Sequence, residues 1–571
     1  MSLAPAARAL VYLTRGIFLA RRAAAGGGTG DLHEGAPPRR EGTGGARRRN
    51  ILFVTTDQQR YDALGATGGT VARTPAVDAL ARAGVLFRRA HVQNGVCMPS
   101  RSTMITGQHP RTHGVIANGI RLPEDTPTVV HVLRAAGYHT AIIGKAHFDP
   151  HLDPLLRFGE NRLAAEGSNG PWRGFDHAEL ATHGPIIGQH YGEWLWQHHP
   201  SAIAGFGAVL TGAGGGETGA PEVKHNPIAR EHYHTDWVAD RTIRWLRQRP
   251  SSQPFFCWMS FPDPHHPFDP PVDEVRARID WRDLPLPDGH PGSRDAIRAI
   301  LAQKPRHWLD WYDGRHHNPE GGPTGFRPAA LTHDQLREVL AMIHVENELI
   351  DEALGRVLSE LVALGVDDHT DVFYTSDHGD LQGDFGLLFK GPYHVESLLR
   401  VPLVWRPAPS AGVAHEVIDA PVGHLDLAPT FCAIAGVEPP SWMEGKRLPT
   451  TLDETSGRER VLTTFDSQFA AVGMRLRTIY RDGWLCTAYE ASTRDRGGRF
   501  PFYWGVWGHG STLPRYEGTE GELYDVNADP HQWENRWSDP SQRRRRDELV
   551  ADLWANLPRE HAPPLPVAAP T

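Results

Sequence analysis

Short, almost continuously apolar runs recur along this chain and are separated by longer segments of mixed polarity. Runs of this kind are typical of strands that are buried on both faces of a sheet. They lie at residues 50–56, 85–87, 140–144, 254–261, 371–375 and 401–405. The clearest amphipathic helix is expected at residues 333–364, where apolar residues return with a helical period. The chain is therefore expected to alternate between strands and helices.

This alternation predicts an α/β fold with a large, mostly parallel, doubly wound sheet flanked by helices. Further helices are expected at residues 75–83, 126–136, 235–248 and 425–435. Later in the chain the pattern changes, and two apolar segments flank Asp482-Gly483, a favoured hairpin turn. We therefore expect a main domain at residues 49–440 and a smaller α+β subdomain at residues 441–571.

Two segments lack a strand or helix pattern. Residues 1–48 contain an apolar stretch that Arg15 interrupts, followed by a Gly-, Pro- and Arg-rich run, so we expect a disordered or targeting extension. Residues 148–228 are rich in Gly, His and Trp without periodicity, which is typical of an irregular functional insert. No apolar run is long enough to span a membrane, and we expect a cytoplasmic protein, with export as the alternative.

Charge and cysteine content exclude some classes of function. The formal net charge of −9 over 571 residues is mild and spread out, which argues against a nucleic-acid partner. The four cysteines lie far apart in the sequence, without the paired spacing of a disulfide framework or a cysteine metal cluster. They are Cys97, Cys257, Cys432 and Cys486. The chemistry is therefore expected to depend on other residue types, or on one cysteine alone.

Polar and ionisable residues follow four of the expected strands. They are Asp57 and Gln58, Lys145 and His147, His265, and Asp377 and His378. In an open parallel sheet, ligands bind at the carboxyl ends of the strands. We therefore expect these side chains to meet in one site. Asp57 and Asp377 offer carboxylate oxygens to a divalent metal ion, Gln58 offers a neutral carbonyl, and His378 offers an imidazole.

The segment from Cys97 to Gly107 is expected to form a short helix. Pro99 suits its first turn, and Gly107 suits the position just past its end. Cys97 would lie at the helix N-terminus, where unpaired N–H groups favour an anion. Arg101 follows one turn later on the same face, and its planar donor fork suits an oxyanion of sulfate or phosphate type.

This segment resembles the signature of the sulfatase family, Cys-x-Pro-Ser-Arg-x-x-x-x-Thr-Gly, at every fixed position. The resemblance implies that a formylglycine-generating enzyme oxidises Cys97 to formylglycine, whose hydrated aldehyde is the nucleophile. It also implies that residues 49–440 form the catalytic domain and that one divalent metal ion is bound. Ca²⁺ is the default of the family, and an imidazole ligand also suits Mn²⁺ or Zn²⁺. The family usually has a second Asp at the position of Gln58, so the expected site carries fewer negative charges.

Further catalytic residues are implied by short matches to family motifs. Lys145 and His147 resemble the pair in Gly-Lys-x-His, and His265 resembles the histidine of Pro-His-x-Pro. Lys390 resembles the lysine that meets the scissile group from the other side. The resemblance implies that Arg101 and the metal favour deprotonation of the nucleophile, that a histidine or lysine protonates the leaving alcohol, and that His147 acts as a base.

The first hypothesis is therefore hydrolysis of a small-molecule or carbohydrate sulfate ester, which releases sulfate and an alcohol. A second hypothesis keeps the same site but changes the substrate to a phosphonate monoester or phosphodiester. Hydrolases of that kind resemble this chain around Asp57-Gln58 and Asp377-His378. A third hypothesis is a catalytically silent protein that binds sulfated ligands.

Overall fold

The computed structural model of this protein describes most of the chain after its first 47 residues. The described residues are 48–151, 153, 156–184, 189–202, 216–224, 226, 228–315, 318, 320, 322, 325–467, 474–491 and 515–568. The prediction for residues 1–48 therefore lies almost wholly outside the described residues. The limits predicted for the two domains stay predictions.

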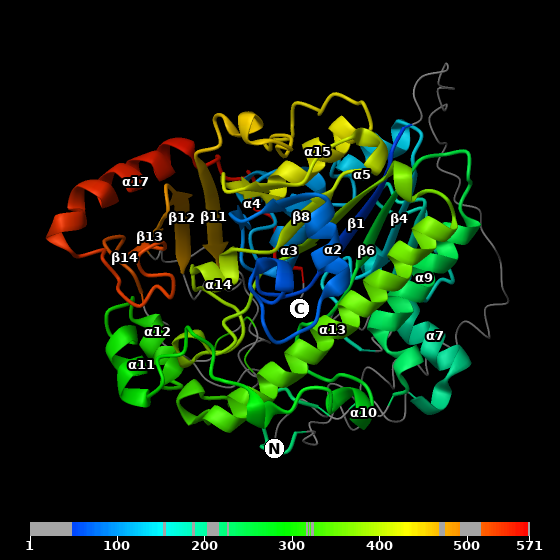
Figure 1. Cartoon of the computed structure of the whole chain (residues 1–571). Coiled ribbons are helices and arrows are strands. Elements are labelled where there is room, and N and C mark those ends of the chain that lie inside the picture. The colour runs from blue at the N-terminus through cyan, green and yellow to red at the C-terminus, as the bar shows by residue number, and fades with distance from the viewer. Residues whose placement is uncertain are drawn as a thin grey trace.

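An eight-stranded sheet forms the centre of the main domain (Figure 1). Its strands, in spatial order, are β5 (His177–Leu180), β4 (His139–Gly144), β6 (Phe255–Ser260), β1 (Asn50–Thr56), β7 (Thr370–Ser376), β8 (Leu403–Arg406), β2 (Val85–Phe87) and β9 (Glu416–Ile418). The strands from β5 to β7 are all parallel to their neighbours. The predicted α/β class and the mostly parallel sheet are confirmed.

Strand β8 is an exception to the parallel order, because it runs antiparallel to both β7 and β2. The segment between β7 and β8 contains a short 3-10 helix at Asp384–Gly386, the one-turn helix α14 (Glu396–Leu399) and loops. It does not carry the chain back across a face of the sheet, so β8 begins at the edge where β7 ends. The sequence pattern predicted the strand but not its direction.

Helices cover both faces of the sheet (Figure 1). One layer contains α3 (Cys97–Thr106), α5 (Val129–Ala135) and α15 (Leu427–Ile434), which pack with Ile51 and Phe53 of β1. The other contains α2 (Pro75–Ala83), α7 (His190–His198), α9 (His234–Gln248) and α13 (His333–Ala363), which pack with Leu52 and Val54. Alternate residues of one buried strand thus serve two cores, which explains its continuously apolar sequence.

Several shorter elements connect the main ones. They are β3 (Ala90–His91), β10 (Val422–Gly423), α4 (Pro110–His113), α6 (Gly159–Arg162), α10 (Asp273–Arg276), α11 (Arg294–Leu301) and α12 (His307–Tyr312). The region 148–228, predicted to be irregular, contains α6, β5 and α7. Strand β5 was missed because its sequence, His-Ala-Glu-Leu, is only four residues long and is not continuously apolar. It adds an edge strand beside β4.

A second, antiparallel sheet follows the main one. Its strands are β11 (Arg460–Asp466), β12 (Arg475–Arg481), β13 (Trp484–Tyr489) and β14 (Gly521–Asp525). The predicted hairpin at Asp482-Gly483 joins β12 to β13. Helix α17 (Arg543–Asn556) covers one face through Leu549 and Leu553. Tyr480 and Leu485 belong to the core of the main sheet, so the two sheets share one apolar contact.

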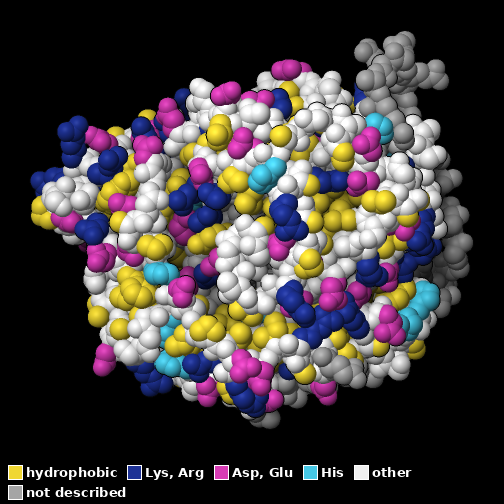
Figure 2. Space-filling view, in the orientation of Figure 1, with side chains coloured by type: hydrophobic (Ala, Val, Ile, Leu, Met, Phe, Trp, Pro, Cys, Tyr) yellow, Lys and Arg dark blue, Asp and Glu magenta, His cyan; other side chains and the backbone are white. Residues whose placement is uncertain are grey.

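The face of the molecule drawn in Figure 2 carries acidic and basic side chains side by side. Basic side chains lie in several groups on this face, one of them near α17, which begins with Arg543, Arg544, Arg545 and Arg546. Within the described part of the chain, no helix combines the length and apolar character needed to cross a bilayer.

Candidate active site

Four parallel strands place their polar residues at the same edge of the main sheet. Asp57 follows β1, Lys145 follows β4, His265 lies five residues after β6, and Asp377 follows β7. Backbone bonds join these strand ends, since the N–H of Asp57 donates to the carbonyl of Asp263 at 3.0 Å. The structure therefore brings together the residues for which the sequence predicted a shared site.

Cys97 is the first residue of α3 and is fully buried at this edge. Its Sγ lies 3.2 Å from Nε2 of His378 and 3.7 Å from Oδ1 of Asp57. Burial and the nearby Asp57 carboxylate raise the pKa of the Cys97 thiol to about 11. The unmodified thiol is therefore protonated near neutral pH and is a weak nucleophile.

Arg101 lies one turn further along α3 and is completely buried. Its Nε donates to Oδ2 of Asp377 at 2.7 Å, and its Nη1 donates to Oγ of Ser260 at 2.9 Å and to the carbonyl of Lys145 at 2.8 Å. These bonds fix the plane of the guanidinium. Its Nη2 is buried without a hydrogen-bond partner, 3.9 Å from Oδ2 of Asp57. This orphaned donor can bind an oxyanion.

Three of the predicted metal ligands converge beside Cys97. Ligand atoms of Asp57, Asp377, His378 and Cys97 all lie within 4.8 Å of one another. Nδ1 of His378 donates to the carbonyl of Gly379 at 2.9 Å, which leaves the lone pair on Nε2, the nitrogen that faces the carboxylates. Burial lowers the pKa of His378, so the ring is neutral and able to ligate. Two carboxylates and a neutral imidazole oriented in this way fit a divalent metal ion.

Gln58 makes contacts other than those expected of a metal ligand. Its backbone N–H donates to Oδ1 of Asp377 at 3.0 Å, and its side-chain amide donates to Asp380. Its carbonyl oxygen accepts from Nζ of Lys390 at 2.8 Å. A backbone φ of 68° at Gln58 directs the side chain toward these partners. The structure thus shows Gln58 holding Lys390, and its role as a metal ligand stays a prediction.

The two lysines predicted to act in catalysis, Lys145 and Lys390, contact different residues of the site. Nζ of Lys145 donates to Asp57 and lies 3.0 Å from Nε2 of His183. Nζ of Lys390 lies 2.7 Å from Nε2 of His265. The rings of His183 and His265 stack with their centroids 4.0 Å apart, so the two ammonium groups flank one pair of imidazoles. Burial would raise the pKa of Asp57, but Lys145 and the other cations outweigh it and hold this pKa well below its usual range.

His147 is the remaining predicted catalytic residue. Its Nε2 lies 3.4 Å from Nδ1 of His151, and its Nδ1 is buried without a partner. Burial, reinforced by the ammonium of Lys145, holds the pKa of His147 well below its usual range. A neutral imidazole with a free nitrogen suits the predicted role of a base. The backbone N–H of His147 donates to Glu160 at 2.7 Å, which fixes the start of the following loop.

Sequence analysis missed two residues of this site, His183 and Asp380. His183 follows β5, the unrecognised edge strand, and recognition of that strand would have placed His183 at the same edge as Lys145. Asp380 lies three residues after Asp377 and pairs with the Gln58 amide. It lies beyond the two residues that directly follow β7, and the sequence alone does not show that the loop turns its carboxylate back toward Gln58.

Comparisons with known proteins agree with this geometry. A family model described as Sulfatase matches residues 49–437. An uncharacterized sulfatase of Escherichia coli is 28% identical over 404 residues, which cover 70% of this chain and 71% of that protein. An N-acetylglucosamine-6-O-sulfatase of Bacteroides thetaiotaomicron is 26% identical over 559 residues, 90% of this chain and 87% of that protein. A phosphonate monoester hydrolase of Agrobacterium radiobacter has a similar fold, with a TM-score of 0.69, 24% identity, and coverage of 89% of this chain and 95% of that one.

The carboxyl edge of this mostly parallel sheet carries Cys97, a candidate metal-ligand set and two lysines. A protein of Trinickia caryophylli named as a multifunctional alkaline phosphatase superfamily protein is 26% identical over 511 residues, 86% of this chain and 92% of that protein. The chain belongs to the sulfatase family, since the family model matches more than half of its residues. The class expected from the motif, a sulfuric ester hydrolase, is confirmed.

Removal of either metal-binding carboxylate should lower metal content. Asp57→Asn and Asp377→Asn each exchange a charged oxygen ligand for a neutral one, and a site with only two carboxylates is expected to lose most of its affinity. Metal analysis of the purified variants gives the readout, with the exposed Asp453→Asn as a control that should keep the metal content of the wild type. Full metal stoichiometry in both site variants would show that the metal lies elsewhere.

Proposed function

We propose that this protein hydrolyses sulfate monoesters and releases sulfate and an alcohol. The observation that carries the proposal is the position of Cys97 at the start of α3, in contact with both Asp57 and His378. Arg101 extends from the same helix with one donor free, so a tetrahedral oxyanion can be held beside the nucleophile position. We expect a small-molecule or carbohydrate sulfate ester as the substrate.

The charge balance of the site supports an anionic substrate. Arg101, Lys145 and Lys390 are buried cations, and the buried carboxylates near them are Asp57, Asp377 and Asp380. A divalent metal ion would leave an excess of positive charge in a medium of low dielectric constant. An anion compensates that excess, and the compensation grows as negative charge develops in the transition state.

Modification of Cys97 supplies the nucleophile in this proposal. The raised pKa of the thiol makes the unmodified residue unreactive near neutral pH, which supports a requirement for conversion to formylglycine. A formylglycine-generating enzyme is then a partner during maturation. The divalent metal ion would supply Lewis-acid stabilisation of negative oxygen; we expect Ca²⁺ as in the family, with Mn²⁺ or Zn²⁺ as alternatives that suit His378.

The other residues bind the sulfate group and move protons. Nη2 of Arg101 donates to a non-bridging oxygen, and the ammonium of Lys145 neutralises the same side of the group. Lys390, held by Gln58 and His265, meets the ester oxygen and stabilises the charge that develops as its bond to sulfur breaks. His147, neutral and with a free nitrogen, accepts a proton when sulfate is expelled.

A phosphonate monoester or phosphodiester is the second candidate substrate. Gln58 favours this second candidate, because this chain has a neutral amide at a position where the sulfatase family usually has a carboxylate. Relative rates decide between the candidates. Nitrophenyl sulfate should be hydrolysed with a higher kcat/KM than nitrophenyl phenylphosphonate, and the reverse order would establish the second candidate.

Cys97→Ala should abolish hydrolysis of both nitrophenyl esters, because it removes the nucleophile. It should leave the fold intact, because Cys97 is a small side chain that lies in the site and contributes little to the packing of the core. Circular dichroism checks the fold, and Cys432→Ala, in the core of α15, serves as a control that keeps activity. Turnover retained by purified Cys97→Ala would contradict the nucleophile assignment. Failure of the wild type to hydrolyse any ester would instead favour a silent binder of sulfated ligands.

Lys390→Ala should harm poor leaving groups more than good ones. A charged hydrogen bond made only in the transition state is worth roughly 2–4 kcal/mol, which is on the order of a hundredfold or more in rate. The slope of log kcat/KM against leaving-group pKa should therefore become steeper for alkyl and aryl sulfates. Lys145→Ala is the matched comparison, because that lysine is expected to act on non-bridging oxygens and to lower all rates by a similar factor. Parallel lines for wild type and Lys390→Ala would contradict the leaving-group role.

A further inference from the structure

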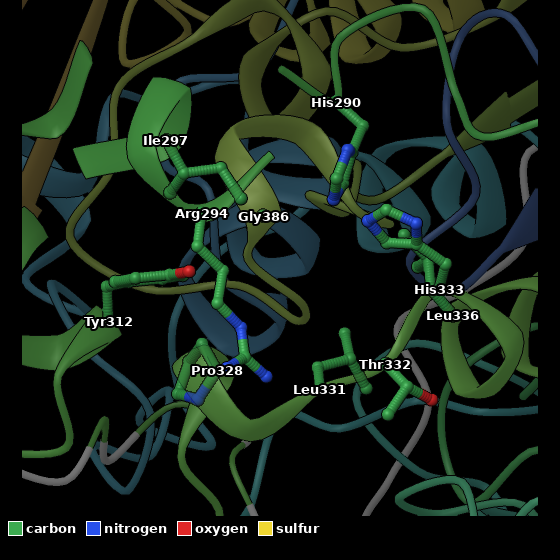
Figure 3. Close-up of a pocket in the computed structure, with 10 residues that line it drawn as sticks. All are labelled: His290, Arg294, Ile297, Tyr312, Pro328, Leu331, Thr332, His333, Leu336 and Gly386. Atoms are coloured by element: carbon green, nitrogen blue, oxygen red, sulfur yellow. The ribbon is translucent and has the colours of Figure 1, made fainter. Parts of the chain in front are cut away.

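A pocket outside the candidate active site opens to solvent and is lined by α11, α12, the start of α13, the segments that precede α11 and α13, and the tip of a loop at Gly386 (Figure 3). Its volume is about 240 Å³. None of the residues predicted to act in catalysis or metal binding lines it. The loop is folded back on itself, because the N–H of Leu381 donates to the carbonyl of Phe389 at 3.1 Å. Its base leads directly to Lys390, so the pocket wall and the active site share one loop.

The polar residues of the pocket are donors and cations. They are His290, Arg294, Tyr312, Thr332 and His333, and none of the ten lining residues is acidic. Within the described ranges of the chain, Arg294 has no carboxylate partner. Arg298, one turn further along α11, pairs with Asp313 at 2.6 Å. A free guanidinium in a lining without carboxylates favours an anion.

His290 adds a directed donor. Its Nδ1 accepts from the N–H of Gly292 at 3.0 Å, so its proton lies on Nε2. Burial and the facing ring of His333, whose centroid is 5.2 Å away, lower the pKa of His290 to about 4, and the ring is therefore neutral near neutral pH. In Figure 3 the two imidazoles lie on one side of the pocket, and the side chain of Arg294 runs along another wall beside Pro328.

The remaining wall is apolar and suits a carbon ring. Ile297 and Leu336 are buried, and Leu331 and Pro328 extend the same surface. Pockets for drug-sized ligands begin at about 300 Å³, so this smaller volume limits a ligand to about one ring. Gly386 has a φ of 69°, and a Cβ there would lie 2.5 Å from Cδ1 of Ile297, so the wall depends on this glycine.

We infer that this pocket is a second binding site for an oxyanion, a carboxylate or sulfate group carried on a single six-membered ring such as a pyranose. Arg294 would bind the anionic group, Nε2 of His290 would donate to a hydroxyl group on another side of the ring, and the apolar wall would contact the ring itself. The ring belongs either to a remote part of the substrate or to a separate molecule that acts through the shared loop. The inference does not depend on the reaction proposed for the active site.

Glucuronate is a suitable probe, because it is a pyranose with a carboxylate and has no ester bond to hydrolyse. Isothermal titration of the full chain should show glucuronate binding to the wild type and to Arg298→Ala. Arg294→Ala should weaken binding by about tenfold or more, since it removes a charged hydrogen bond, and Arg294→Lys should restore part of it. Neutral glucose should bind far more weakly than glucuronate. The side chain of Arg294 is exposed, so its replacement should leave the fold unchanged.

Equal affinity of wild type and Arg294→Ala, or no binding by the wild type, would overturn the inference. Purely competitive inhibition of nitrophenyl sulfate hydrolysis would overturn it too, because it would place glucuronate in the active site. If the site is real, an altered kcat with glucuronate assigns it to a separate effector, and an unaltered rate assigns it to the remote part of a substrate. Binding needs no turnover, so an inactive protein that binds glucuronate would contradict the proposed hydrolysis and leave this inference standing.

Discussion

Two buried ion pairs, Arg101 with Asp377 and Lys145 with Asp57, hold the carboxyl edge of the main sheet together. Charges that are removed from water are tolerated only when each is paired and hydrogen-bonded, and a single missing partner would leave an expensive uncompensated charge. The pairs join α3 to β7 and β4 to β1, so the element that carries Cys97 is fixed to the strands that precede the candidate metal ligands Asp57 and Asp377. In the proposed reaction, these cations together with a bound metal ion would exceed the charge of the carboxylates, and the excess positive charge would attract a sulfate group.

The positions of the parallel strands and of most candidate site residues could be predicted from the local sequence. A strand buried on both faces must be apolar throughout, so its end is marked sharply by the first charged residue, as at Asp57 and Asp377. Parallel strands end at one edge, and convergence of these residues follows from topology alone. The boundaries of the helix between Cys97 and Gly107 could also be predicted from the local sequence, because the helix ends at a glycine, Gly107, with a left-handed φ of 65°.

What the sequence pattern missed depends on tertiary contacts. Strand β5 exists because β4 offers it an edge, and its own residues show little strand character, so His183 was not assigned to the site. The amide contacts of Gln58 with Asp380 and Lys390 could not be predicted, because they depend on a loop more than three hundred positions away in the sequence, and its role as a metal ligand stays a prediction. The reversed direction of β8 likewise depends on how the loop after Asp377 folds over the site.

The proposed reaction depends most on the chemical state of Cys97, because the buried thiol is a weak nucleophile and the reaction needs its oxidised form. Mass spectrometry of the proteolytic peptide that contains Cys97 tests this directly, with protein made in a host that has a formylglycine-generating enzyme. We expect a peptide in which the side-chain sulfur is replaced by oxygen with loss of two hydrogens, in proportion to the activity on nitrophenyl sulfate. Full activity from protein whose Cys97 peptide carries only the thiol would contradict the proposed reaction.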